Sequence, residues 1–126
     1  MVLFRNKPII MTGKMLNVEF TADVLKKAKF PDKVPLVKEW DDREVWGQAS
    51  NFHWDNYAQA IVGDIEVHKV LPFIGYGPQL ELLKWKKGFP QEISAFRLKS
   101  VSLVKQPMHA KFKLRRINTK RRLGTT

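Results

Sequence analysis

Short runs in which apolar and polar residues alternate recur along the chain, and they predict strands. Near the N-terminus, Leu16, Val18 and Phe20 share one face, because successive side chains of a strand point to opposite sides. The run 58–70 is largely apolar and contains several β-branched residues, and Gly63 interrupts it. We expect a strand there, with a bend or bulge at the glycine.

Two further runs, 79–86 and 93–105, also have the alternation of strands. In the second run, the face that carries the apolar residues changes between Leu98 and Val101. A regular strand with one buried face does not allow such a change. We therefore expect either a bulge near Ser100 or burial of both faces.

The run 110–115 alternates strictly, and we interpret it as a second basic strand. Alternate residues of a strand lie about 7 Å apart, so a row of cations on one face could follow an extended polyanion. A solvated strand face is also often rich in lysine, which discourages aggregation between sheet edges. The apolar face comprises Ala110, Phe112 and Leu114, and the basic face comprises Lys111, Lys113 and Arg115.

Helix signals are few. Thr21 is a suitable N-cap for a short helix over 22–28, and Asp23 is favourable in its first turn. Pro31 and Pro35 then end regular structure, because proline has no backbone N–H to donate.

These elements predict a mostly β protein, a small single-domain barrel or sandwich with at most one or two short helices. The five-stranded oligonucleotide-binding barrel (OB-fold) is the favoured form, and an α+β arrangement is the alternative. The predicted domain covers 1–117. The remaining segment, 118–126, has almost nothing to bury, and we expect a flexible basic tail.

The positive charge is concentrated near the C-terminus. The 126-residue chain has a net charge of +11, and 93–126 contains ten Lys or Arg and no acid. Residues 1–92 contain thirteen bases and all twelve acids. Such a segment favours nucleic acid, an anionic membrane or an acidic protein as partner. A membrane surface is disfavoured, because the charges follow β-type alternation rather than an amphipathic helix.

Aromatic residues cluster between 38 and 57, which contains three of the four tryptophans. These rings either form the core of a small domain or present faces on which unpaired bases stack. The acids Glu39 and Asp41 argue against phosphate contacts around Trp40. A loop over 73–78 displays two more rings. The candidates for base stacking are Trp54, Phe73, Tyr76 and Trp85.

The chain lacks the residues or motifs that several kinds of functional site require. The chain has no cysteine, which excludes disulfides and thiolate sites. His53, His68 and His109 are isolated in sequence, and no glycine-rich phosphate loop is present, so we expect no metal and no cofactor. The N-terminus lacks the apolar region of a signal peptide, and no apolar run approaches a spanning length. The expected location is cytoplasmic, or intracellular within a packaged particle.

One segment resembles a nuclease site. Asp64, Glu66, His68 and Lys69 follow one another on a predicted strand, as the carboxylates and lysine of a Mg²⁺-dependent nuclease do. The lysine, however, lies three residues after Glu66, which places it on the other face of a regular strand. A nuclease is therefore the third hypothesis, and we expect a protein that is not an enzyme.

The leading hypothesis is a protein that binds single-stranded nucleic acid, DNA before RNA, with little sequence preference, in replication or packaging. The alternative is a structural component of a ribonucleoprotein or virion, such as a ribosomal or capsid-associated protein, whose basic tail is ordered only in the assembly. A homo-oligomer or larger assembly is left open. The predicted phosphate contacts are Arg97, Lys99, Lys111, Lys113, Arg115, Lys120, Arg121 and Arg122.

Overall fold

The computed structural model describes residues 2–15, 18–69, 75–88, 91–107 and 109–114. It confirms the mostly β class, with one short α-helix and one 3₁₀ helix in these residues. The elements are β1 (Val2–Met11), β2 (Gly13–Met15), β3 (Val18–Phe20), α1 (Ala22–Lys27), β4 (Lys33–Lys38), β5 (Asp41–Asp55), β6 (Ala60–Val67), β7 (Gly75–Lys86), β8 (Gln91–Val104) and the 3₁₀ helix η1 (Ala110–Phe112).

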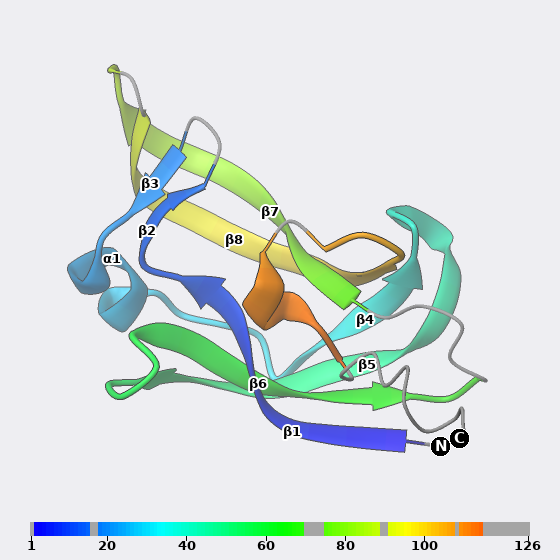
Figure 1. Ribbon diagram of the computed structural model, residues 1–126. Helices are drawn as coiled ribbons and strands as arrows, with labels where there is room; N and C mark the ends of the chain where they lie inside the picture. The colour runs from blue at the N-terminus through cyan, green and yellow to red at the C-terminus, as the bar shows by residue number, and fades with distance from the viewer. Residues whose placement is uncertain (1, 16–17, 70–74, 89–90, 108, 115–126) are drawn as a thin grey trace.

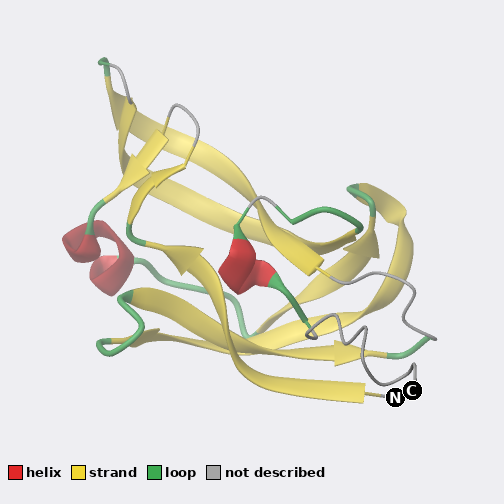
Figure 2. Ribbon diagram, viewed as in Figure 1, coloured by secondary structure: helices red, strands yellow, loops and turns green. Residues whose placement is uncertain are grey.

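All eight strands belong to one sheet, which curls into an open half barrel (Figures 1 and 2). The strand order is β1-β6-β5-β4-β8-β3-β2, and β7 pairs with β8 outside this path. Strands β1, β6 and β5 form one side of the curl and β7 and β8 the other, with β4 between them (Figure 1). The finer likeness to a five-stranded OB-fold stays a prediction. The core within the curl includes Ile9, Leu36, Ile65, Ile93, Leu103 and Phe112.

Strand β8 connects the two sides of the sheet. It pairs in parallel with β3 near its start and with β4 near its end, and β7 runs antiparallel along its whole length. Leu80 lies opposite Leu98 and Gln79 lies opposite Ser100, so Lys99 is an extra residue in β8. Every residue from Ser100 to Val104 is buried. The bulge and the burial of both faces, which the sequence offered as alternatives, therefore both occur.

Gly63 lies where two neighbouring strands are irregular. Registers shift in β1 between Phe4 and Lys7 and in β5 between Ser50 and His53, so the extra residues belong to the neighbours of β6. A Cβ on Gly63 would lie 2.8 Å from the ring of Phe52, so only glycine fits without displacing that ring. The predicted irregularity at this glycine is present, but the bulges lie in β1 and β5.

The short helix α1 forms where the sequence predicts it. The hydroxyl of Thr21 accepts a hydrogen bond from the Val24 N–H at 3.3 Å, which satisfies one of the free donors of the first turn. Asp23 lies in that turn, and Leu25 is buried against the sheet. No helix in the described residues is long and apolar enough to cross a bilayer.

The predicted strand over 110–115 is wrong, because Ala110–Phe112 forms the 3₁₀ helix η1. His109 stabilises this turn with two acceptors: its Nδ1 accepts from the Lys111 N–H and its carbonyl accepts from the Phe112 N–H, both at 3.0 Å. The helix lies between β1 and β7, in the opening of the half barrel (Figure 1). The alternation in burial nevertheless holds after Ala110, since Phe112 and Leu114 are buried and both lysines are exposed.

Candidate nucleic-acid interface

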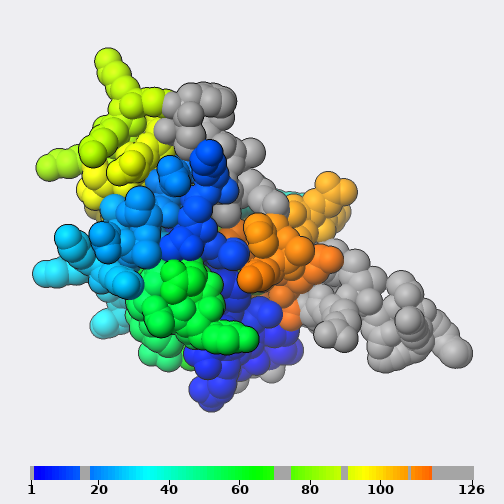
Figure 3. Space-filling model, turned by 60° about the vertical axis from the view of Figure 1, so that its left-hand side comes forward, coloured from blue at the N-terminus to red at the C-terminus, as the bar shows by residue number. Residues whose placement is uncertain are grey.

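A hairpin arm, formed by the end of β7 and the start of β8, projects from the body of the sheet (Figures 1 and 3). Trp85 on this arm is 48 % exposed, and Leu83 is 51 % exposed. Lys84, Lys86 and Lys87 are exposed as well. We call these five residues, 83–87, the basic arm. It combines an accessible indole ring with three cations and contains no acid.

Two bulges set the direction of the side chains in the arm. Leu83 is an extra residue in β7, and Ser94 is an extra residue in β8. Trp85 pairs with Ile93, so the indole lies on the same face of the hairpin as that buried side chain. Bulges increase twist and redirect side chains. The indole therefore lies on the apolar face of the sheet but outside the core, and about half of its surface is exposed to solvent.

The two predicted cations of β8 differ in their surroundings. The guanidinium of Arg97 donates a hydrogen bond to the carboxylate of Glu81, its cross-strand partner. The Glu81 carboxylate occupies one donor of the guanidinium and partly neutralises its charge, which weakens its attraction for a phosphate. Lys99 is exposed at its bulge. Of the two, Lys99 is the better-placed candidate for a phosphate contact.

Lys111 and Lys113 lie at the opposite end of β7 from the basic arm. Lys113 forms an isolated antiparallel bridge with Gly75, the first residue of that strand. Twelve residues of strand at about 3.3 Å each separate the ends of β7 by roughly 36 Å. Lys111 and Lys113 are thus well separated from the basic arm, and Arg97 and Lys99 lie opposite the middle of β7, between the two. The predicted contacts Arg115, Lys120, Arg121 and Arg122 lie outside the described residues.

Of the three stacking candidates among the described residues, Trp85 is the most exposed. Tyr76 as a stacking residue is wrong, because it is 0 % exposed and its hydroxyl donates to the carbonyl of Pro8 at 2.6 Å. Trp54 is half-buried against the core, with the Lys26 Nζ 5.4 Å from its ring centroid. Phe73 lies outside the described residues.

Sequence reasoning did not select the three lysines of the basic arm, although their signal is visible. The letters Lys-Trp-Lys-Lys at 84–87 end the predicted strand 79–86 and place a ring among cations. It also passed over Trp40, which is 44 % exposed. The acids beside Trp40 argued against phosphate contacts there. The sequence also does not predict the left-handed backbone of the turn that contains it.

The residues of the nuclease hypothesis have other contacts. Asp64 Oδ1 accepts from the Asn6 N–H at 3.0 Å and Oδ2 accepts from Asn51 Nδ2 at 3.3 Å. Both asparagines have left-handed φ angles, 51° and 58°, at the bulges of β1 and β5. Glu66 Oε2 lies 2.5 Å from His68 Nε2. Within the described ranges, no group of three or more His, Asp or Glu could hold a metal ion.

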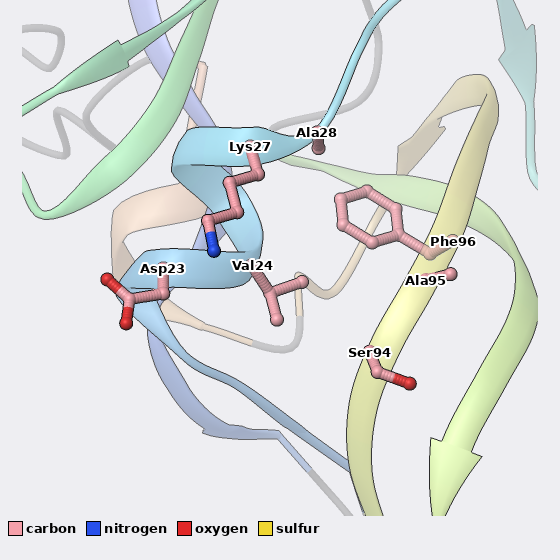
Figure 4. A pocket seen from close by; sticks show the side chains of 7 residues that line it. All are labelled: Asp23, Val24, Lys27, Ala28, Ser94, Ala95 and Phe96. Atoms are coloured by element: carbon pink, nitrogen blue, oxygen red, sulfur yellow. The ribbon is translucent and has the colours of Figure 1, made fainter.

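A shallow cavity of about 350 Å³ opens between α1 and β8, beside the arm (Figure 4). The ring of Phe96 points from β8 toward the helix and contacts Phe20 edge-on, with centroids 5.2 Å apart. The charged groups of the lining are the exposed Asp23 and Lys27 on one side of α1. No buried polar group converges on the cavity among the lining residues, which are Asp23, Val24, Lys27, Ala28, Ser94, Ala95 and Phe96.

Comparison with known proteins gives no relative: no protein-family model, no curated protein and no solved structure matches this chain.

Proposed function

We propose that this protein binds single-stranded nucleic acid, DNA in the first instance, with little sequence preference, and that the basic arm is its main contact. The observation that carries the proposal is the half-exposed Trp85 among the exposed Lys84, Lys86 and Lys87. Lysines attract any phosphate backbone, whereas an indole face stacks only on bases that are not already stacked in a duplex.

The magnitudes favour a joint role for ring and cations. Stacking of one base on an aromatic side chain contributes about 1–3 kcal/mol and tolerates any base. Each phosphate that a lysine neutralises releases counterions, and the affinity then falls steeply with salt. The ring supplies the preference for unpaired bases, and the lysines supply much of the affinity.

The test is a tryptophan-fluorescence titration of the purified protein with single-stranded DNA, RNA of the same sequence and duplex DNA, each at two salt concentrations. We expect strong quenching by the single strands, a weak response to the duplex and a steep salt dependence. Trp85→Ala should remove much of the quenching and weaken single-strand binding by about 5- to 150-fold, the equivalent of one lost stacked base.

Tyr57→Ala is the matched control, because that ring is 99 % exposed and lies outside the arm. It should bind like the wild type. Equal binding to all three nucleic acids without quenching would contradict the proposal. That result would instead favour the structural component of a ribonucleoprotein or virion, which needs a basic surface but no stacking ring.

A further inference from the structure

The turn between β4 and β5 has a backbone that its residues rarely adopt. Lys38 pairs with Asp41, so Glu39 and Trp40 form a two-residue hairpin turn. Their φ angles are 48° and 65°, both left-handed. Two-residue turns of this kind usually contain Asn-Gly, since a side chain with a bulky Cβ substituent is strained there. Trp40 is therefore held in a strained conformation.

Hydrogen bonds to β8 hold this turn in place. The Glu39 N–H donates to the carbonyl of Leu103 at 2.9 Å, and the Trp40 N–H donates to the hydroxyl of Ser102 at 2.7 Å. Ser102 is fully buried. Among the described residues, the buried polar side chains are those of Ser100 and Ser102. Because the Ser102 hydroxyl is buried, its hydrogen bond holds the backbone of Trp40 in place.

The indole of Trp40 lies over Gly77 of β7. A Cβ on Gly77 would approach the indole Cη2 to 3.1 Å, so the absence of a side chain lets the ring lie close to the strand. Trp40 nevertheless remains 44 % exposed. It borders a cavity of about 470 Å³ whose other lining residues are Glu39, Tyr76, Gly77, Val104, Lys105 and Gln106.

Strain, anchoring and exposure together argue for a ligand. A glycine at position 40 would relieve the strained φ and still offer its N–H to Ser102. Trp40 has a strained backbone although its side chain is only partly buried. Strained residues that their surroundings hold in place are typical of binding sites. A rigid, half-exposed aromatic face beside a cavity suits a flat ring as its partner.

We propose that the cavity at Trp40 is a second base-stacking site, which takes one unpaired nucleobase of the strand bound by the basic arm; this rests on the proposed function. Glu39 and Lys105 both line the cavity, so the lining has no net charge that would favour a phosphate, and an uncharged base suits it better than the backbone. Gly77 and Trp85 are eight residues apart on β7, about 26 Å. One oligonucleotide of about eight or more nucleotides spans that distance even at the spacing of a duplex strand.

The test is Trp40→Gly, which removes the ring and relieves the backbone. The probes are a labelled 20-nucleotide single-stranded DNA and a polyphosphate of similar charge, which carries no bases. We expect a thermal midpoint equal to or above that of the wild type, DNA affinity reduced at least five-fold and unchanged polyphosphate affinity. Trp40→Phe, which keeps an aromatic face, should retain more DNA affinity than Trp40→Gly.

The outcomes separate this inference from the function on which it rests. If the wild type fails to bind the oligonucleotide, the proposed function is wrong. If the wild type binds and Trp40→Gly binds equally well, the arm carries the function and Trp40 is not a base site. An equal loss of affinity for DNA and polyphosphate would also overturn the inference, because the variant would then have altered the charge interaction and not the stacking.

Discussion

The phenol of Tyr76 connects β7 with β1, which lie on opposite sides of the curled sheet. Its hydroxyl on β7 donates to the carbonyl of Pro8 on β1, and its ring packs on Phe112 of η1 with centroids 5.4 Å apart. Burial raises the pKa of Tyr76 far above its ordinary value, because the charged phenolate would lose its hydration. The residue therefore remains a hydrogen-bond donor throughout the physiological range.

This burial predicts how stability depends on pH. Tyr76→Phe should lower the free energy of unfolding at pH 7 by about 1–2 kcal/mol, since the Pro8 carbonyl loses its partner. Above the ordinary pKa of 10.0, the unfolded state of the wild type ionises and the native state does not. The stability of the wild type should then fall by up to about 1.4 kcal/mol per pH unit, and the difference between the two proteins should shrink.

Urea unfolding of both proteins between pH 7 and pH 11 measures this difference. Tyr57→Phe serves as the control, because Tyr57 is exposed and its replacement should leave the curve unchanged. A constant difference between Tyr76→Phe and the wild type across this range would show that the phenol ionises equally in the native state.

At the scale of elements, the basic arm should account for much of the salt dependence of binding. Replacing Lys84, Lys86 and Lys87 with glutamine removes three cations from one exposed strand end. If each neutralises one phosphate of a single strand, the slope of log affinity against log salt should become shallower by about 2. The measurement is a binding titration at four or more salt concentrations.

A variant of equal net charge tests whether the position of these cations matters. Lys14, Lys29 and Lys33 are exposed on or beside other elements, so their replacement with glutamine removes the same charge elsewhere. This control should change the slope much less than the arm variant. Equal changes would mean that net charge, and not the arm, governs binding.

The elements also show which features the sequence can predict. The Thr21 cap was predictable because capping joins residues three positions apart. The strand prediction for 110–115 was wrong, because the alternation of Phe112 and Leu114 with lysines fits any segment with one buried side. The side chain of His109 stabilises a helical turn there instead. The irregular pattern of β5 hid a 15-residue strand, since the bulge near Asn51 changes the face of its rings.

Contacts between distant segments account for the errors in the site. The sequence around Tyr76 is typical of a loop, which predicts an exposed ring. Tyr76 is buried by contacts with residues far away in the chain, among them Pro8 and Phe112. Trp40 depends in the same way on Ser102, which is 62 positions away. The charge asymmetry was visible in the sequence, but the separation of Arg97 and Lys99 from Lys113 along β7 followed only from the sheet topology.

For the whole molecule, the described residues and the C-terminal segment carry charge differently. The described residues contain eighteen bases and twelve acids, a net charge of +6. The other five bases lie beyond Leu114, a buried residue that packs in the core. Five of the eleven net positive charges thus follow the last described core residue in the sequence.

Deletion of 118–126 should therefore separate binding from folding. It removes Lys120, Arg121 and Arg122 from a segment whose sequence has almost nothing to bury, so the thermal midpoint should stay unchanged. Single-strand binding should weaken most at low salt, where unscreened cations attract the backbone over about 10 Å or more. Full-length protein with these three residues replaced by glutamine should lose the same affinity if charge is the cause. Unchanged affinity at low salt would leave the basic arm as the main source of attraction.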